Sequence, residues 1–275
     1  IGTGGLDYDR DINAISKYIG DIEKVLIGNL NYELVQIPQT DLTSYGSSLL
    51  EYVNPFGCSS VCLYDKRLGM IHCRNLDWPL PEIKDSTIII DYINAEAGDF
   101  TAVTMPGFVG VLSGVAKGRF SANLNFAPSI EGPNISGWGA SFILRYVFEN
   151  CRTYSEALDF LSEQASIFPY LIQLCGTKSN ESAVIEVMPL SDNNVFYKKN
   201  KPLALTNHYR SEEDFDTDFL KDSLKRYKKI RKLSEQIESD CISSYKKILK
   251  TKPVFNDETV QSMIFNSKTG DIVLF

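Results

Sequence analysis

The feature that most constrains the fold is a β-hairpin signal at residues 59–77. Two apolar runs, 59–64 and 70–77, flank the polar stretch 65–69, which ends in glycine. Runs of this length on either side of a turn signal predict two antiparallel strands. The second run ends with Arg74 and Asp77, although charged side chains are rarely buried in an apolar strand without a partner. The hairpin therefore predicts both sheet structure and a polar site at one end.

The order of the remaining segments predicts the architecture. Further strands are predicted at 87–93, 100–105, 108–115, 120–126, 170–175, 183–188, 195–198, 203–206, 260–265 and 272–275. Helices are predicted at 140–150, 153–164 and 218–238, and the second of these opens on the capping-box residues Thr153 and Glu156. Because strands and helices follow one another in blocks, the chain is expected to form an α+β sandwich of two antiparallel sheets between helical layers.

Residues 1–57 are expected to form a separable leading segment ahead of a main domain at 58–275. Aliphatic residues at spacings of three and four predict an amphipathic helix over 8–28 (Ile12, Ile15, Ile19, Ile22, Val25, Leu26). A turn-rich stretch and an Asn-Pro pair follow it. Two roles for the apolar face stay open: burial against the main domain, or packing beside a pocket to take a lipid chain from a membrane.

The hairpin register places a cysteine beside both charged residues. A turn centred near Arg67 pairs Cys58 with Leu76. Cys58 then lies one step from Asp77 and two from Arg74, within the ~7–8 Å reach of diagonal neighbours. Such neighbours can change the pKa of a thiol. A plain structural ion pair between Arg74 and Asp77 is the alternative interpretation.

Two ways of activating the Cys58 thiol stay open. The chain has two histidines, His72 and His208, and a papain-like pair would use His208. Alternatively, cleavage between Gly57 and Cys58 would leave a free α-amine, with a pKa of about 7.7–8.0, to accept the thiol proton. The first 57 residues contain no cysteine, so the two pieces would separate without a reductant.

From Gly57 to its end, the sequence resembles the N-terminal-nucleophile hydrolases of the choloylglycine hydrolase type, including their acid-ceramidase-like branch. The resemblance is carried by Cys-Ser-Ser at 58–60 with Arg-Asn-Leu-Asp-Trp at 74–78, by Ala-Asn-Leu-Asn-Phe at 122–126, and by Leu-Thr-Asn-His at 205–208. It implies a four-layer αββα fold, a cysteine nucleophile freed by autocatalytic cleavage, and no cofactor or metal.

The resemblance also implies a thioester route for amide cleavage. Cys58 would attack an amide carbonyl while its α-amine carries the proton. Asp77 would orient that amine, and Arg74 would stabilise Asp77 and the thiolate.

Three further residues complete the implied site. Asn125 and a backbone N–H would hold the oxyanion, Asn207 would bind the substrate or the amine, and Arg226 would complete the polar ring. The expected substrate is a linear N-acyl amide, such as a bile-salt conjugate, an N-acylethanolamine or a ceramide. Acyl transfer to an amine and a non-catalytic binding protein are the alternatives.

The net charge and the length of the apolar runs limit the kinds of binding partner that are expected. The formal charge of −7 argues against nucleic acid as the main partner, because phosphate binding needs a basic field. No apolar run approaches the ~20 residues that span a bilayer, so any membrane contact is expected to be peripheral. The first ten residues lack a signal pattern, which leaves both a cytoplasmic location and export after signal removal open.

A zinc site is the competing chemistry for the hairpin. Its candidate ligands are Cys58, Cys62, His72 and Cys73. Neighbouring residues of a strand point to opposite faces of the sheet, so His72 and Cys73 cannot converge on one ion. The sequence therefore predicts no metal from this set.

Overall fold

The computed structural model describes residues 57–79, 82–127, 134, 137–198, 200–210, 217–237 and 241–275. The predicted helix at 8–28 lies outside the described residues. Within the described part, the elements follow the order that the sequence pattern indicates, with two short additions.

The predicted hairpin lies at the centre of a five-stranded antiparallel sheet with the order β10-β1-β2-β11-β12. Its strands are β1 (Gly57–Asp65), β2 (Gly69–Asp77), β10 (Leu203–Leu205), β11 (Thr259–Asn266) and β12 (Ile272–Leu274). Cys58 pairs with Leu76 and Tyr64 with Met70. The predicted register is therefore confirmed.

The second sheet has seven antiparallel strands in sequence order, from β3 to β9. Its strands are β3 (Ile88–Tyr92), β4 (Phe100–Thr104), β5 (Ser113–Ala116), β6 (Phe120–Asn125), β7 (Tyr170–Cys175), β8 (Ser182–Val187) and β9 (Asn194–Tyr197). Strands that are neighbours in the sheet also follow one another in the chain, so this sheet is a meander, although residues 126–169 separate β6 from β7.

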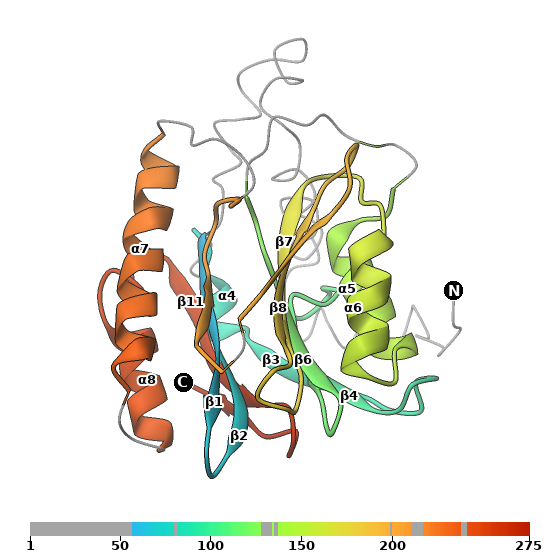
Figure 1. Ribbon diagram of the computed structural model, residues 1–275, viewed down its shortest axis with the longest axis horizontal. Coiled ribbons are helices and arrows are strands. Elements are labelled where there is room, and N and C mark those ends of the chain that lie inside the picture. Colours follow the sequence, from blue (N-terminus) through green and yellow to red (C-terminus); the bar gives the residue numbers. More distant parts are fainter. Residues whose placement is uncertain are drawn as a thin grey trace.

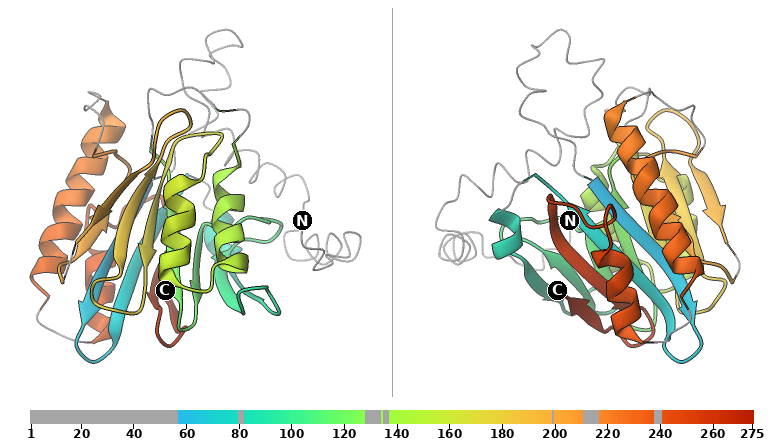
Figure 2. Two further views of the ribbon diagram at one scale, coloured as in Figure 1. Left: turned by 45° about the vertical axis from the view of Figure 1, so that its right-hand side comes forward. Right: turned by 90° about the vertical axis from the view of Figure 1, so that its left-hand side faces the viewer.

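Helices cover the outer face of each sheet, which makes four layers (Figures 1 and 2). The helices are α4 (Glu82–Asp85), α5 (Ala140–Asn150), α6 (Tyr154–Glu163), α7 (Asp218–Glu235) and α8 (Ile242–Lys250). α7 and α8 pack on the five-stranded sheet, and α5 and α6 on the seven-stranded sheet. The predicted αββα architecture is confirmed.

Two predictions about individual elements need correction. The strand predicted at 108–115 is only Ser113–Ala116, because the backbone N–H of Val111 donates to the carbonyl of Ser141 at the start of α5 instead of joining the sheet. Helix α8 was not predicted. Its apolar residues Tyr245, Ile248 and Leu249 have helical spacing, but a nine-residue helix depends on packing against the sheet for its stability.

The space between the two sheets differs from the two outer cores. The outer cores are built mainly from aliphatic and aromatic side chains. Between the sheets, by contrast, polar side chains are fully buried, and they include Ser60, His72, Ser121, Asn123, Gln173 and Ser267. Buried polar groups need partners, so this layer depends on side-chain hydrogen bonds for its geometry.

Candidate active site

The Cys58 thiol lies in this polar layer. Cys58 is the second residue of β1 and is fully buried. Val61 and Leu63 belong to the outer core, so the alternation along the strand places Cys58 on the inner face. Arg74 Nη2 lies 3.4 Å from Cys58 Sγ, and the thiol lies 3.8 Å from the carbonyl oxygen of Leu124. The sequence prediction that Arg74 neighbours this thiol is confirmed geometrically.

Asn125 is held in one orientation by its neighbours. Arg74 Nη1 donates to the Leu124 carbonyl (2.7 Å) and to Asn125 Oδ1 (3.2 Å). Asn123 Nδ2 donates to the same Oδ1 at 2.7 Å, and Asn125 Nδ2 donates to the Thr206 carbonyl at 2.8 Å. Two donors on Oδ1 fix the amide so that its NH₂ group points away from them.

Asp77 lies on the other face of β2. It is three residues from Arg74, and side chains alternate along a strand, so the two point to opposite sides of the sheet. Asp77 Oδ1 accepts from Thr259 Oγ1 at 2.6 Å, while Oδ2 has no hydrogen-bond partner and lies 3.9 Å from Arg226 Nη1. The expectation that Arg74 stabilises Asp77 is therefore corrected: the ion partner of Asp77 is Arg226 from α7.

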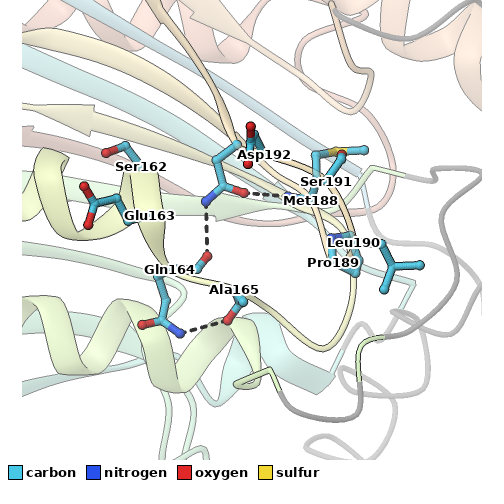
Figure 3. Close-up of a pocket in the computed structure, with 10 residues that line it drawn as sticks. Ser162, Glu163, Gln164, Ala165, Met188, Pro189, Leu190, Ser191 and Asp192 are labelled. Carbon is cyan, nitrogen blue, oxygen red and sulfur yellow. Dashed lines mark hydrogen bonds between the residues drawn. The ribbon is translucent and has the colours of Figure 1, made fainter.

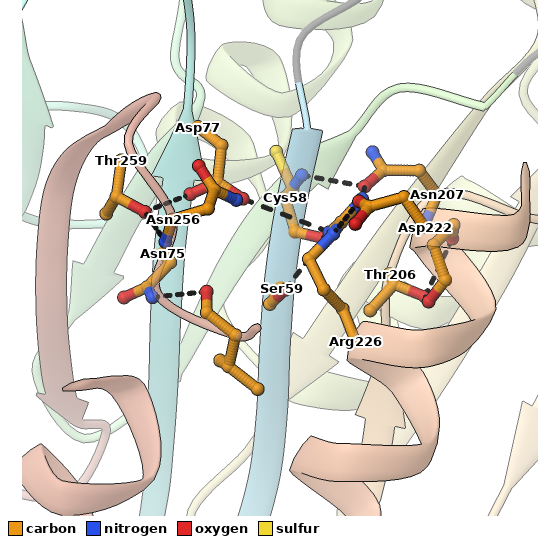
Figure 4. Close-up of polar contacts among 12 residues, drawn as sticks. Cys58, Ser59, Asn75, Asp77, Thr206, Asn207, Asp222, Arg226, Asn256 and Thr259 are labelled. Atoms are coloured by element: carbon orange, nitrogen blue, oxygen red, sulfur yellow. Dashed lines mark hydrogen bonds and ion pairs between the residues drawn. The ribbon is translucent and has the colours of Figure 1, made fainter. Parts of the chain in front are cut away.

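Arg226 connects the outer helix to the start of β1 (Figure 4). Its Nη1 donates to the Cys58 carbonyl (2.5 Å) and to Ser59 Oγ (3.1 Å), and its Nη2 donates to Asn207 Oδ1 (2.9 Å). Its Nε donates to Asp222 Oδ2 at 2.6 Å. The guanidinium is fully buried, so these partners compensate the cost of removing its charge from water.

Asn207 completes the ring around the Cys58 backbone. The N–H of Cys58 donates to Asn207 Oδ1 at 2.7 Å. Asn207 Nδ2 donates to the Phe126 carbonyl at 2.7 Å, and the Asn207 N–H donates to Ser223 Oγ at 2.8 Å. The structure thus brings all six predicted site residues together around the Gly57–Cys58 peptide.

Gly57 is packed closely against the side chains of Asp77 and Arg226. A Cβ atom at this position would lie 3.3 Å from Asp77 Oδ2 and 3.4 Å from Arg226 Nη2. Contacts this tight would force a side chain or its neighbours to move. Glycine therefore lets the peptide bond between Gly57 and Cys58 lie beside the Asp77 carboxylate oxygen that makes no hydrogen bond.

Burial dominates the protonation of both groups. Burial raises the pKa of Cys58 to about 11, although Arg74 and Arg226 lower it. Burial also raises the pKa of Asp77, against the opposing effect of Arg226. In the intact chain the thiol is therefore neutral near pH 7, and it needs a base before it can act as a nucleophile.

The structure does not support an imidazole as that base. His208 Nδ1 lies 3.1 Å from Thr206 Oγ1 and 2.9 Å from Ser223 Oγ, while the thiol contacts Arg74 and a carbonyl. His72 Nδ1 lies 3.0 Å from Ser121 Oγ, and His72 is two residues along β2 from Arg74. The papain-like alternative is therefore not supported.

A pocket in the described part of the chain lies away from these residues. It has a volume of about 550 Å³ and is lined by residues 162–165 and 188–193, beside the end of α6 (Figure 3). Asn193 ties its walls together, accepting from the Met188 N–H and donating to the carbonyls of Leu161 and Gln164. No predicted site residue lines this pocket.

Sequence reasoning missed three supporting residues: Thr259 on Asp77, Asp222 on Arg226, and Asn123 on Asn125. The spacing of four between Asp222 and Arg226 on a predicted helix was a usable signal for their ion pair. The spacing of two between Asn123 and Asn125 on one predicted strand was also a usable signal, because alternate residues share a face. Thr259 carried no such signal, because its contact with Asp77 depends on pairing between distant strands.

Comparison with known proteins identifies the family. Residues 65–267 match the family model described as acyl-coenzyme A:6-aminopenicillanic acid acyl-transferase. The chain belongs to this acyl-transferase family. The match contains Arg74, Asp77, Asn125, Asn207 and Arg226, and it begins seven residues after Cys58.

Two curated proteins are similar in sequence to most of this chain. It is 30% identical over 226 residues to an N-acylethanolamine-hydrolyzing acid amidase of Caenorhabditis elegans, covering 76% of this chain and 61% of the relative. It is 27% identical over 241 residues to an acid ceramidase of Bos taurus, covering 78% of this chain and 60% of the relative. The chain thus spans about three fifths of these relatives. The resemblance to N-terminal-nucleophile hydrolases is confirmed.

Solved structures agree with the fold. An N-acylethanolamine-hydrolyzing acid amidase ortholog from Caenorhabditis elegans superposes with a TM-score of 0.64 at 26% identity, covering 78% of this chain and 94% of the other. A conjugated bile acid hydrolase from Clostridium perfringens gives a TM-score of 0.52 at 12% identity, covering 79% and 92%. The second similarity concerns the fold alone. None of the described helices combines the length and apolar character needed to cross a membrane.

Proposed function

We propose that this protein is a cysteine amidase that cleaves a linear N-acyl amide through a thioester on Cys58. Cleavage between Gly57 and Cys58 activates it and divides the chain into a leading segment (1–57) and a catalytic part (58–275). The observation that carries this proposal is the peptide between these two residues, which lies beside Asp77 Oδ2, an oxygen without a hydrogen bond, and beside the guanidinium of Arg226.

The new α-amine supplies the base that the intact chain lacks. After cleavage, the amine of Cys58 replaces the amide that donates to Asn207 Oδ1, and it can also donate to Asp77 Oδ2. The amine takes the thiol proton as Sγ attacks the amide carbonyl, and the same proton then goes to the leaving amine. Water next attacks the thioester and releases the acid and the free thiol.

Asn125 and Arg74 serve the oxyanion side. Asn125 is held by Arg74 and Asn123 so that its Nδ2 group can donate to developing negative charge. A fixed donor of this kind contributes about 3–4 kcal/mol in other oxyanion holes. Arg74 lies beside the sulfur and stabilises the thiolate.

The substrate class follows from the relatives. They are named for hydrolysing N-acylethanolamines and ceramides, which are both N-acyl amides of lipid character. We therefore propose a lipid N-acyl amide over a bile-salt conjugate, whose hydrolase shares only the fold.

Acyl transfer is the second candidate, and the description of the matched family favours it. In that reaction an amine, in place of water, attacks the same thioester. Product analysis with labelled N-acylethanolamine and a second amine separates the two reactions: free acid indicates hydrolysis and a new amide indicates transfer.

Intact mass and a non-reducing denaturing gel test the activation step. The chain should separate into fragments of 57 and 218 residues. Cys58→Ala should stay in one piece. Asp77→Asn should slow both cleavage and turnover by roughly 100-fold or more, because Asp77 holds the α-amine that carries out the acid–base step. A Cys58→Ala chain that still divides at this bond would contradict self-cleavage. Full turnover by an undivided chain would contradict the role of the α-amine.

A further inference from the structure

A second group of reactive side chains lies between the sheets and is not used by the chemistry at Cys58. Cys62 and His72 face each other in the β1–β2 ladder, and Cys175 ends β7 in the opposite sheet. One potential ligand atom from each of the three lies within 4.8 Å of the other two. All three residues are fully buried.

We propose that Cys62, His72 and Cys175 form a binding site for one Zn²⁺ ion that joins the two sheets. Ligand atoms around tetrahedral zinc are about 3.5–3.8 Å apart, given Zn–S of ~2.3 Å and Zn–N of ~2.0–2.1 Å. Side-chain adjustments of well under ~1 Å at each residue would bring the three ligand atoms to that spacing.

The charges fit a dry interior. Two thiolates and a neutral imidazole neutralise the two charges of Zn²⁺, so the loaded site has no net charge to bury. Binding releases one proton from each thiol.

The surroundings of His72 are also those of a metal ligand. Nδ1 lies 3.0 Å from Ser121 Oγ, whereas Nε2 makes no hydrogen bond of good geometry. The amides of Asn123 and Gln173 approach the ring, and the carbonyl oxygen of each has no hydrogen-bond partner. A metal-bound histidine usually donates its other N–H to an oxygen. With Nε2 on the ion, Nδ1 would donate to Ser121 Oγ.

These three ligands differ from the four candidates that were considered, and rejected, from the sequence alone. Cys73 points to the outer core beside α8, and Cys58 lies four residues along β1 from Cys62. Cys175 takes their place from more than 100 residues away, and Met70 supplies a further sulfur in the same cluster with Cys62 and Cys175. Only the packing of the two sheets brings Cys175 to the hairpin.

Metal analysis of the full chain, produced in zinc-supplemented medium, tests the proposal. We expect about one Zn²⁺ per chain in the parent and a loss of at least about tenfold in Cys175→Ser. Cys73→Ser is the matched control: it removes a buried thiol next to His72 in sequence, and it should keep the ion. Cys58→Ala should also keep it, which separates this site from the proposed nucleophile.

A second measurement does not depend on the variants. Co²⁺ supplied in place of Zn²⁺ should give the intense visible bands of tetrahedral cobalt and a thiolate-to-metal charge-transfer band. A parent chain without stoichiometric metal would overturn the proposal. So would zinc retained in Cys175→Ser, zinc lost in Cys58→Ala, or a mass showing a Cys62–Cys175 disulfide in the purified chain.

Discussion

At the scale of single residues, the site depends on how one carboxamide is turned. Asn125 can present its NH₂ group to an oxyanion only while its Oδ1 is held by other donors. Asn123 and Arg74 are those donors, at 2.7 and 3.2 Å. Asn123 is therefore a positioning residue for the proposed reaction, although it does not contact the thiol.

Asn123→Asp tests this role with almost no change in shape. The new carboxylate would accept from Asn125 and favour the opposite amide orientation, which removes the donor from the oxyanion position. We expect kcat to fall by about 10–100-fold with little change in KM, somewhat less than the loss of an oxyanion donor itself. Steady-state kinetics measure both constants.

Ser60→Ala is the matched control, because Ser60 Oγ is the weaker partner of Asn123 at 3.4 Å and does not contact Asn125. It should keep kcat within about twofold, the range expected for a variant that leaves the orientation of Asn125 intact. An unchanged kcat in Asn123→Asp would show that Arg74 and the Thr206 carbonyl orient Asn125 without Asn123.

At the scale of elements, α7 matters because it brings Arg226 through the outer layer to the start of β1. The helix is held to the sheet by buried residues along one face, including Leu220 and Ile230. Its N-terminus is capped by Thr217, whose side chain accepts from the Leu220 N–H at 3.2 Å. The cap therefore stabilises the first turns of the helix, which precede Arg226.

Two cap variants separate the function of α7 from simple stability. Thr217→Ala and Thr153→Ala, at the N-caps of α7 and α6, should each lower the free energy of unfolding by about 1 kcal/mol. Only Thr217→Ala should also lower turnover, because α6 carries none of the site residues. Urea midpoints and kcat give the two quantities. Equal turnover in both variants would contradict the special role of α7.

Elements that are stabilised by contacts between residues close in sequence were predicted better than elements that depend on distant parts of the chain. Helix α6 was predicted together with its cap, and Thr153 Oγ1 does accept from the Glu156 N–H at 3.1 Å, because a cap involves neighbours in sequence. Helix α8 was missed because its stability comes from Tyr245, Ile248 and Leu249 packing on a distant sheet. The strand predicted to begin at 108 was wrong for the same reason, because the backbone of Val111 is bonded to the start of α5 and not to a neighbouring strand.

At the scale of the whole molecule, buried thiols link stability to alkaline pH. Burial raises the pKa of Cys73, whereas an unfolded cysteine titrates near 8.5. Below that pH both states hold the proton and stability is unaffected. Above it only the unfolded chain releases the proton, so the free energy of unfolding falls by up to about 1.4 kcal/mol per pH unit for this thiol.

Cys73→Ala should therefore have a shallower loss of stability between about pH 8.5 and 10.5 than the parent. Its stability at neutral pH should be lower, because the substitution leaves a small cavity in the core beside α8. Urea midpoints across this range measure the slope for each protein. Parallel slopes would mean that Cys73 is already accessible to solvent in the folded chain.

The sequence by itself determined the strand order within the central hairpin, its register, and the neighbourhood of Cys58 and Arg74. Those features follow from the period of two and one short turn, both of which are local. It also indicated the six residues of the site through family resemblance, and the structure places them together.

Only the tertiary structure decided which charged residues of the site form an ion pair. Asp77 pairs with Arg226 rather than Arg74 because the two residues of β2 face opposite sides of the sheet and α7 crosses the outer one. The approach of Cys175 to Cys62 and His72 depends on how the two sheets stack. Sheet stacking joins residues far apart in the chain, and no local pattern in the sequence records it.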